Sequence, residues 1–212
     1  SNLGMMILYN MFNEREDVWC ERVFSPWMDL DKIMREEHIP LFALESQEPV
    51  KEFDFLGITL GYEMCYTNVL QILDLSHISL LAKDRKEDDP IVIGGGACAY
   101  NPEPIAEFFD MFYIGEGETV YDALFDVYKA TKAAGGSRKD FLFAASKIPG
   151  IYVPSLYNVS YKEDGTIASF TPVKEGIPEK VCKQLITDVT RDYRAIKAPV
   201  VPFIKATQDR VT

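Results

Sequence analysis

Two short apolar runs in this sequence each lead directly into a glycine-rich segment. Pro90–Ile93 (PIVI) precedes Gly94, Gly95 and Gly96, and Met111–Ile114 (MFYI) precedes Gly115, Glu116, Gly117 and Glu118. A short run that is apolar throughout is typical of a strand buried on both faces, as in a parallel sheet. Ligands bind such sheets at the carboxyl ends of the strands, where glycine allows close approach to the main chain. These glycines and Glu116 are therefore candidate ligand contacts.

The remaining apolar runs predict alternating strands and helices. Further strands are expected at Val18–Phe24, Leu41–Leu44 and Phe53–Leu60. The expected helices are Leu3–Phe12, Asp29–Glu37, Glu63–Leu75, Pro104–Phe109, Thr119–Ala134 and Ser137–Ala145. The second helix would bury Leu30, Ile33 and Met34, and Ser137 would cap the last one. This order indicates an α/β fold: a Rossmann-like (flavodoxin-like) parallel sheet with helices on both faces.

The alternation of predicted strands and helices ends at Gly150. Ile151–Val153, Tyr157–Tyr161 and Ile167–Phe170 have β-like composition, and the last two flank the turn Glu163-Asp164-Gly165, which predicts a small β-hairpin. Beyond Gly176 the chain is proline-containing and weakly periodic, as expected of a linker. We therefore predict an α/β domain at residues 1–149, followed by a hairpin appendage and linker at residues 150–212.

The glycine turns match no nucleotide-binding motif. GGGACA has Ala99 where GxGxxG requires its third glycine, GEGETV continues with Val120, and there is no GxxxxGK[ST] loop. Glycine after a strand also serves a tight turn without any ligand, so the structural interpretation stays open. Glu116 and Glu118 could form a carboxylate pair, but stabilisation of a helix N-terminus is favoured for them.

Tyr62 and Glu63 follow the strand that ends at Leu60, so the parallel sheet would bring them to the same edge as the glycine turns. They could line a pocket there. Alternatively, Tyr62 and Tyr66 form one aromatic ridge of a helix packed on the sheet. His38 and His77 each follow a helix and are interpreted as helix-end or surface residues, so no catalytic residue is predicted.

Charge and cysteine content exclude several functions. The net charge of −11 disfavours direct binding of nucleic acid, because Lys83, Arg85 and Lys86 lie among acidic residues. The four cysteines are scattered, with no CxxC or CxxxCxxC, so no metal or iron-sulfur site is predicted. No run of apolar residues is long enough to span a membrane, and no secretion signal is visible, which favours a cytoplasmic location.

The segment IVIGGGACAYNPEPIAEFFDMFYIGEGE at residues 91–118 resembles the cobalamin-binding domains attached to radical S-adenosylmethionine (radical SAM) enzymes. The resemblance extends through LGITLGYEMCYTNVL (residues 56–70), IPGIYVPSLY (148–157) and PFIKATQDRVT (202–212). Together these segments are similar to an uncharacterised radical SAM family. The resemblance thus covers nearly the whole chain.

This resemblance implies a cobalamin at the strand ends, near Gly94, Gly95, Gly96, Gly115, Glu116, Gly117, Tyr62 and Glu63. It implies that the family's first strand precedes SNLG and is missing here. It also implies that the CxxxCxxC of the [4Fe-4S] cluster and the S-adenosylmethionine site belong to a downstream radical SAM domain, which would be this domain's partner. Known cobalamin carriers ligate cobalt through the His of a DxHxxG loop, and neither His38 nor His77 lies in such a motif.

Three candidate functions follow from the sequence. The first is a cobalamin-binding module that supports radical-based modification by the full-length protein. The second, an independent nucleotide-binding or flavodoxin-like enzyme, lacks a phosphate loop or catalytic cluster. The third is a structural or interaction domain that has lost the cofactor. The first and third share one fold, and the first is favoured.

Overall fold

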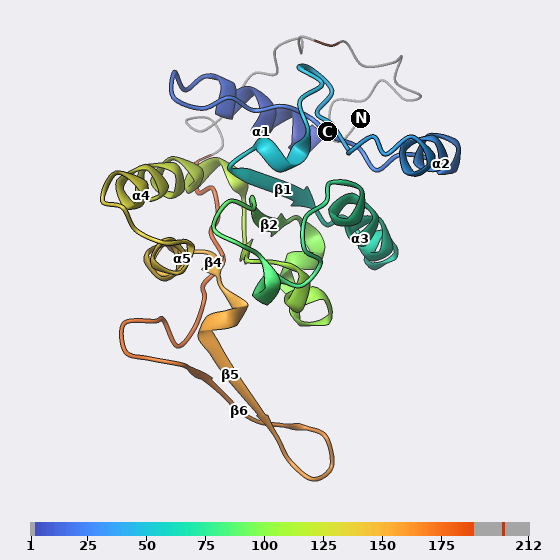
Figure 1. Cartoon of the computed structure of the whole chain (residues 1–212). Coiled ribbons are helices and arrows are strands. Elements are labelled where there is room, and N and C mark those ends of the chain that lie inside the picture. Colours follow the sequence, from blue (N-terminus) through green and yellow to red (C-terminus); the bar gives the residue numbers. More distant parts are fainter. Residues whose placement is uncertain (1–2, 189–200, 202–212) are drawn as a thin grey trace.

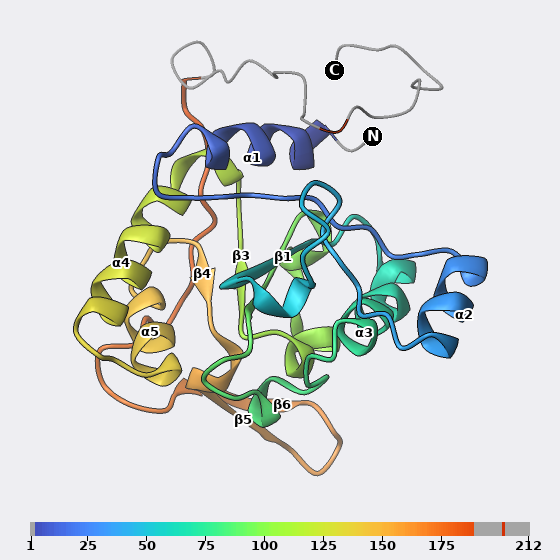
Figure 2. The ribbon, with the colours of Figure 1, turned by 45° about the horizontal axis from the view of Figure 1, so that its top comes forward.

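The computed structural model describes residues 3–188 and 201, and it has an α/β fold. One sheet has four strands in the order β1-β2-β3-β4: β1 (Phe55–Thr59), β2 (Ile91–Gly95), β3 (Met111–Tyr113) and β4 (Ile151–Tyr152). The first three strands are parallel, and β4 pairs antiparallel with β3. The predicted mostly parallel sheet is therefore confirmed, and Figure 2 shows helices on either side of it.

The helices of the described chain follow the predicted alternation with the strands. The α-helices are α1 (Leu3–Asn13), α2 (Met28–Glu36), α3 (Tyr66–Leu75), α4 (Tyr121–Ala133) and α5 (Arg138–Ala145). Short 3-10 turns occupy η1 (Val50–Glu52), η2 (Glu63–Cys65), η3 (Ala82–Asp84), η4 (Ala97–Tyr100), η5 (Glu103–Phe108), η6 (Gly117–Thr119) and η7 (Pro154–Leu156). The side chain of Ser137 caps α5 in a capping box with Asp140, as its position before an apolar run predicts.

Each face of the sheet carries its own apolar core. On one face, Leu56, Val92 and Phe112 pack with residues of α3 and of the turns η4 and η5. On the other, Ile91, Ile93 and Met111 pack with residues of α4 and α5. Because strand side chains alternate between faces, burial on both faces accounts for the uninterrupted apolar character of PIVI and MFYI.

The prediction of a strand at Val18–Phe24 is wrong, because the structure has no strand there. Leu41–Leu44 likewise forms no strand, only an isolated bridge between Phe42 and Pro49. The apolar composition of these runs is real, but a strand exists only where a neighbouring backbone pairs with it. Of the predicted buried face of α2, only Met34 is buried, while Leu30 and Ile33 are 44% and 50% exposed.

The predicted hairpin is present at the end of the described chain. The strands β5 (Tyr157–Tyr161) and β6 (Ile167–Pro172) pair with each other alone and project from the main body (Figure 1). Strand β4, which follows residue 149, pairs with β3 and so belongs to the main sheet. Most of the predicted linker, residues 189–200 and 202–212, lies outside the described residues.

Candidate functional site

The loops that follow β1, β2 and β3 meet at one end of the sheet, here called the carboxyl edge (residues 60–66, 95–100 and 114–119). Main-chain hydrogen bonds join the first two loops: the Leu60 N–H donates to the Gly95 carbonyl at 2.7 Å, and the Cys98 N–H donates to the Leu60 carbonyl at 3.0 Å. In the third loop, the Tyr113 hydroxyl donates to the Glu116 carbonyl at 2.6 Å. Parallel pairing thus brings both glycine turns together.

Two of the candidate glycines, Gly94 and Gly96, are required by packing inside the chain. A Cβ on Gly94 would lie 2.7 Å from Phe112 Cδ1, whereas one on Gly117 would meet only the end of the flexible Leu8 side chain, 2.9 Å from Cδ2. Gly96 has a φ of +96°, and a Cβ there would lie 2.9 Å from the Leu60 carbonyl oxygen. Gly95 differs, since the nearest atom to its Cβ position would be the Tyr121 hydroxyl at 3.9 Å. Gly95 therefore leaves open space beside the main chain.

Gly115 is covered by a later part of the chain. Its φ is +131°, and a Cβ there would overlap the main chain of Gln184. The Gln184 N–H donates to the Ile114 carbonyl and the Glu116 N–H donates to the Gln184 carbonyl, each at 3.0 Å. The Glu116 carboxylate accepts from the Ile186 N–H and makes no helix-capping bond at η6. The atoms that closely approach the main chain of Gly115 therefore belong to Gln184 of the same chain.

Tyr62 and Glu63 lie at the carboxyl edge as predicted from their position after β1, and both are exposed. Tyr62 is not part of α3, which begins at Tyr66, so the two tyrosines do not share a helical ridge. Met64 is 83% exposed and Tyr100 is 55% exposed in the adjoining loops, and neither was singled out from the sequence. Their position directly after buried strands is the signal that could have found them.

A cavity of about 670 Å³ lies below the carboxyl edge and runs along β1. Its walls come from α1, residues 17–23, residues 52–59, α4 and the glycine turns, including Gly95, Gly96, Gly115 and Gly117. Gly94, Glu116, Tyr62 and Glu63 are not in its lining. The cavity thus extends along the whole length of β1. It reaches the candidate loops only where it meets the carboxyl edge.

Burial weakens the acidity of several groups around this cavity. Burial raises the pKa of Tyr121 well above its ordinary value, and the neighbouring Tyr113 adds to that shift. Burial also raises the pKa of Tyr113, and it raises the pKa of the Cys20 thiol to about 12, with Glu45 and Glu21 contributing. These groups stay neutral at physiological pH. They line the cavity as hydrogen-bonding or apolar groups and do not serve as bases or nucleophiles.

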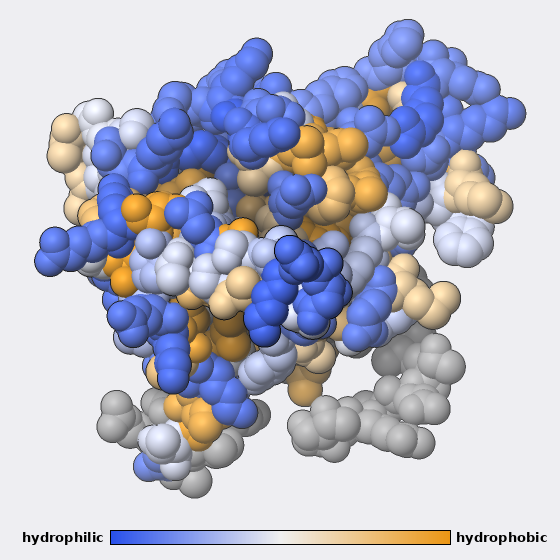
Figure 3. All heavy atoms as spheres, turned by 90° about the horizontal axis from the view of Figure 1, so that it is seen from below, coloured by the Kyte–Doolittle hydropathy of each residue, from blue (hydrophilic) through white to orange (hydrophobic). Residues whose placement is uncertain are grey.

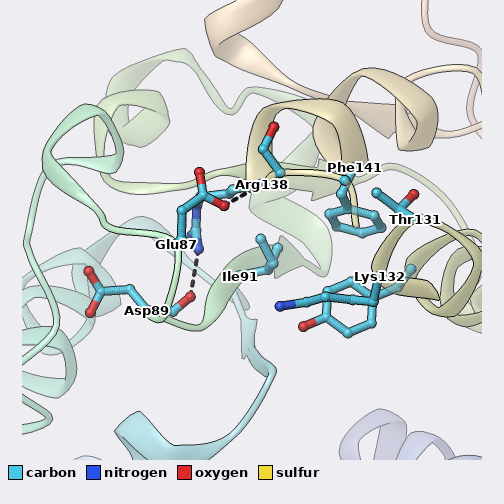
Figure 4. A pocket seen from close by; sticks show the side chains of 10 residues that line it. Glu87, Asp89, Ile91, Thr131, Lys132, Arg138 and Phe141 are labelled. Atoms are coloured by element: carbon cyan, nitrogen blue, oxygen red, sulfur yellow. Dashed lines mark hydrogen bonds between the residues drawn. The ribbon is translucent and has the colours of Figure 1, made fainter. Parts of the chain in front are cut away.

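The opposite end of the sheet is held by a buried ionic cluster centred on Asp110. Its Oδ2 accepts from Arg85 at 2.7 Å, from Arg138 at 2.6 Å and from the Val92 N–H at 2.8 Å. Arg138 also binds the Asp89 carbonyl at 2.6 Å beside a small hollow of about 20 Å³ (Figure 4). Because these charges are paired within the chain, the cluster is structural.

Neither histidine lies at the carboxyl edge. His38 and His77 follow the C-terminal ends of α2 and α3, with φ values of 55° and 54°. Within residues 3–188 and 201, no group of three histidine, cysteine or acidic side chains could hold a metal ion, and all four cysteines are free. In the same part of the chain, no helix has the length and apolar character needed to cross a membrane.

Apolar and hydrophilic residues are mixed on the face of the molecule seen from the side of the hairpin. Figure 3 shows apolar patches on this face that hydrophilic residues separate from one another. Acidic residues outnumber basic ones by 33 to 22 in the sequence, so the surface as a whole is negatively charged.

Comparison with known proteins identifies the family of this chain. A family model described as "Radical SAM proteins, N-terminal" matches residues 4–154, most of the chain. The chain is 38% identical over 87 residues to "Uncharacterized protein MJ0966" of Methanocaldococcus jannaschii, a match that covers 40% of this chain and 18% of that protein. No solved structure matches the chain. The chain belongs to the family of radical SAM proteins, as an N-terminal region of that family.

Proposed function

We propose that this chain is the accessory domain of a radical SAM enzyme and that its carboxyl edge holds cobalamin for a catalytic domain elsewhere in the full-length protein. The observation that carries the proposal is the convergence of three strand-end loops, with Gly95 open and Tyr62 and Tyr100 exposed beside it. Glycine allows a flat group to approach the main chain, and aromatic rings provide apolar contact area.

The residues at the carboxyl edge fit a cobalamin held by backbone and aromatic contacts. They do not fit one whose cobalt is ligated by imidazole, because His38 and His77 lie at helix ends away from these loops. Cobalamin, when bound, supplies the organometallic centre for radical or group-transfer chemistry. In this proposal the chain binds the cofactor, orients it and excludes water from one side of it.

In this proposal S-adenosylmethionine and the [4Fe-4S] cluster belong to the catalytic domain, which is this domain's partner. The four cysteines of the present chain are dispersed over the fold, which is consistent with a cluster site outside it. The net charge of −11 argues against direct contact of this domain with a nucleic acid.

A visible absorption titration tests the cofactor. Hydroxocobalamin is added to the full-length protein and to the 212-residue chain, and we expect the cobalamin absorption bands to shift on binding. Gly95→Val fills the open space beside the main chain and should weaken binding by about tenfold or more, a loss typical for a blocked close contact. Tyr161→Ala, a matched control on the hairpin where Tyr161 is 66% exposed, should bind normally.

A second candidate is an interaction domain without a cofactor, favoured by the observation that Gly94, Gly96, Gly115 and Gly117 all meet atoms of the chain itself. Here the exposed side chains of Met64 and Tyr100 would contact the catalytic domain directly. Hydroxyl-radical footprinting distinguishes the two functions. Protection of these two residues in the cobalamin-free full-length protein, together with an unchanged cobalamin spectrum, would support the interaction domain and contradict the cobalamin site.

A further inference from the structure

The hairpin formed by β5 and β6 has one polar face and one apolar face. Side chains alternate between the two faces along each strand, and residues paired across the strands share a face. Ser160 and Ser169 are paired, and their hydroxyl oxygens are 2.6 Å apart on the polar face. The side chains of the opposite face are those of Tyr157, Val159, Tyr161, Ile167, Phe170 and Pro172. One face of the hairpin is therefore apolar and largely aromatic.

This apolar face is covered by the main body only near the base of the hairpin. The centroid of the Tyr157 ring lies 5.1 Å from that of Phe170 and 5.3 Å from that of Tyr152 in β4. Toward the tip, Tyr161 and Ile167 are exposed. A two-stranded hairpin has little stability in water unless another strand or a helix covers its apolar face. The exposed part of this face therefore indicates a partner that the described residues do not supply.

The main chain of β5 is bonded to β6 along one side only. At the base of the hairpin, the Val173 N–H donates to the Leu156 carbonyl at 2.9 Å. Near the tip, the Lys162 N–H donates to the Thr166 carbonyl at 2.8 Å. In an antiparallel pair, residues bonded to the neighbouring strand alternate with residues whose N–H and C=O point outward, so even-numbered residues of β5 face β6. The outward residues are Tyr157, Val159 and Tyr161. Their main-chain groups have no hydrogen-bond partner among the described residues.

The outer edge of β6, unlike that of β5, has features that hinder pairing with a further strand. Pro172 has no N–H, and Ala168 is left without a partner where the register between the strands shifts. Proline and bulges are common protections of an exposed edge, as are charged side chains. β5, with the sequence YNVSY, contains no proline and no charged residue. The edge that is open to pairing is therefore that of β5.

The sequence of β5 indicates which strand fits this edge. YNVSY is nearly the same in both directions about Val159. When two copies of β5 pair antiparallel with Val159 opposite Val159, Tyr157 of one copy lies opposite Tyr161 of the other. Asn158 then lies opposite Ser160, so the aromatic face and the polar face both continue across the contact. The strand is thus complementary to itself, as a two-fold symmetric interface requires.

The hairpin strands also reduce the charge repulsion between two copies. Each chain has a net charge of −11, so its acidic surface repels a second copy. Neither β5 nor β6 contains a charged residue, and the hairpin projects from the main body (Figure 1). Antiparallel pairing points the two hairpins in opposite directions, so the two main bodies lie at opposite ends of the shared sheet.

We propose that β5 pairs antiparallel with β5 of a second copy of this chain, around a two-fold axis at Val159. The two hairpins then form one four-stranded sheet with a continuous apolar face. Val159 exchanges main-chain hydrogen bonds with its counterpart, and Tyr157 does so with Tyr161 of the second copy. The contact is small, so the dimer is weak and its population depends on protein concentration. The carboxyl edge takes no part in it, so the dimer is independent of any cofactor.

Sedimentation equilibrium tests the dimer in the full-length protein and in the 212-residue chain, at concentrations between about 1 μM and about 500 μM. We expect both to show an equilibrium between monomer and dimer. A monomer at all these concentrations, for either protein, would overturn the proposal. If the full-length protein alone stays monomeric, its catalytic domain covers β5 instead of a second copy.

Val159→Pro tests pairing through the main chain. Proline removes the outward N–H of residue 159 and leaves the bonds to β6 in place, so the dissociation constant of the dimer should rise about tenfold or more. Val159→Thr keeps the N–H and the branched side chain, and it should dimerise as the unchanged chain does. Thermal unfolding checks that both variants fold. A dimer that Val159→Pro leaves unchanged would place the contact elsewhere and contradict the proposal.

Charged variants test the two-fold axis without altering the main chain. At the axis residue 159 faces its own counterpart, so Val159→Lys and Val159→Glu each place like charges opposite one another and should weaken the homodimer. A mixture of the two variants, one of them carrying a fluorescent label, should form a heterodimer more tightly than either variant forms a homodimer. A mixture that associates no better than the separate variants would exclude the axis at Val159 and overturn the proposal.

Discussion

The main chain of Gln184 lies directly on Gly115, although 69 positions separate the two residues in the chain. Two hydrogen bonds of 3.0 Å, from Gln184 to Ile114 and from Glu116 to Gln184, hold the later segment on the turn that follows β3. Only glycine permits this approach, because it lacks a Cβ and adopts the φ of +131°. The glycine-rich turn thus fixes the path of residues 182–186 across the carboxyl edge.

We predict that Gly115→Ala lowers the free energy of unfolding by more than the 1–3 kcal/mol or so that a positive φ alone costs. Gly135→Ala is the matched control, since Gly135 has a φ of +71° but no atom within 4 Å of its Cβ position. The difference between the two variants in urea unfolding measures the contact with Gln184. Equal losses in the two variants would mean that this contact contributes nothing.

The buried charge cluster at the other end of the sheet gives a second prediction. The side chains of Asp110 and Arg85 are 2% and 0% exposed, and burial lowers the pKa of Arg85 despite the opposing effect of Asp110. Asp110→Asn leaves Arg85 and Arg138 without their anion, and we expect a loss of about 3–5 kcal/mol in the free energy of unfolding.

The exposed pair of Arg15 and Asp126 provides the control for that prediction. Their charged atoms are 2.8 Å apart, but the Asp126 side chain is 68% exposed. Asp126→Asn should therefore change the free energy of unfolding by about 1 kcal/mol or less. Urea unfolding measures both variants, and similar losses would contradict a special role for the buried cluster.

Local signals in the sequence were sufficient for much of this fold. The uninterrupted apolar runs PIVI and MFYI predict β2 and β3 because both faces of the sheet are covered, and Ser137 predicts the start of α5 because its side chain satisfies a helix N–H. Convergence of the glycine turns at the carboxyl edge followed from the parallel order alone.

The sequence could not predict features that depend on distant partners. Residues 18–24 have strand-like composition, but pairing requires a neighbour that the described chain does not provide. The contact between Gly115 and Gln184, the pairing of β4 with β3, and the neutralisation of Asp110 by two arginines all join residues far apart in sequence. Periodicity and turn composition carry no information about such contacts.

The thiol of Cys20 beside the cavity gives a third prediction, which concerns pH. Burial raises its pKa to about 12, and the carboxylates of Glu45 and Glu21 act in the same direction. The folded chain therefore holds this proton more tightly than the unfolded chain, whose cysteines have a pKa of about 8.5. The corresponding contribution to stability is complete below that ordinary value and is lost as the pH rises from it toward 12.

Iodoacetamide labelling followed by mass spectrometry measures this shift, because only the thiolate reacts. In the native chain at pH 8, exposed Cys182 should be labelled well before Cys20, and the rate at Cys20 should rise about tenfold with each pH unit up to about pH 11. In urea both cysteines should react at similar rates, which controls for local sequence. Labelling of Cys20 at the rate of Cys182 in the native chain at pH 8 would show that the wall of the cavity formed by residues 17–23 opens readily to solvent.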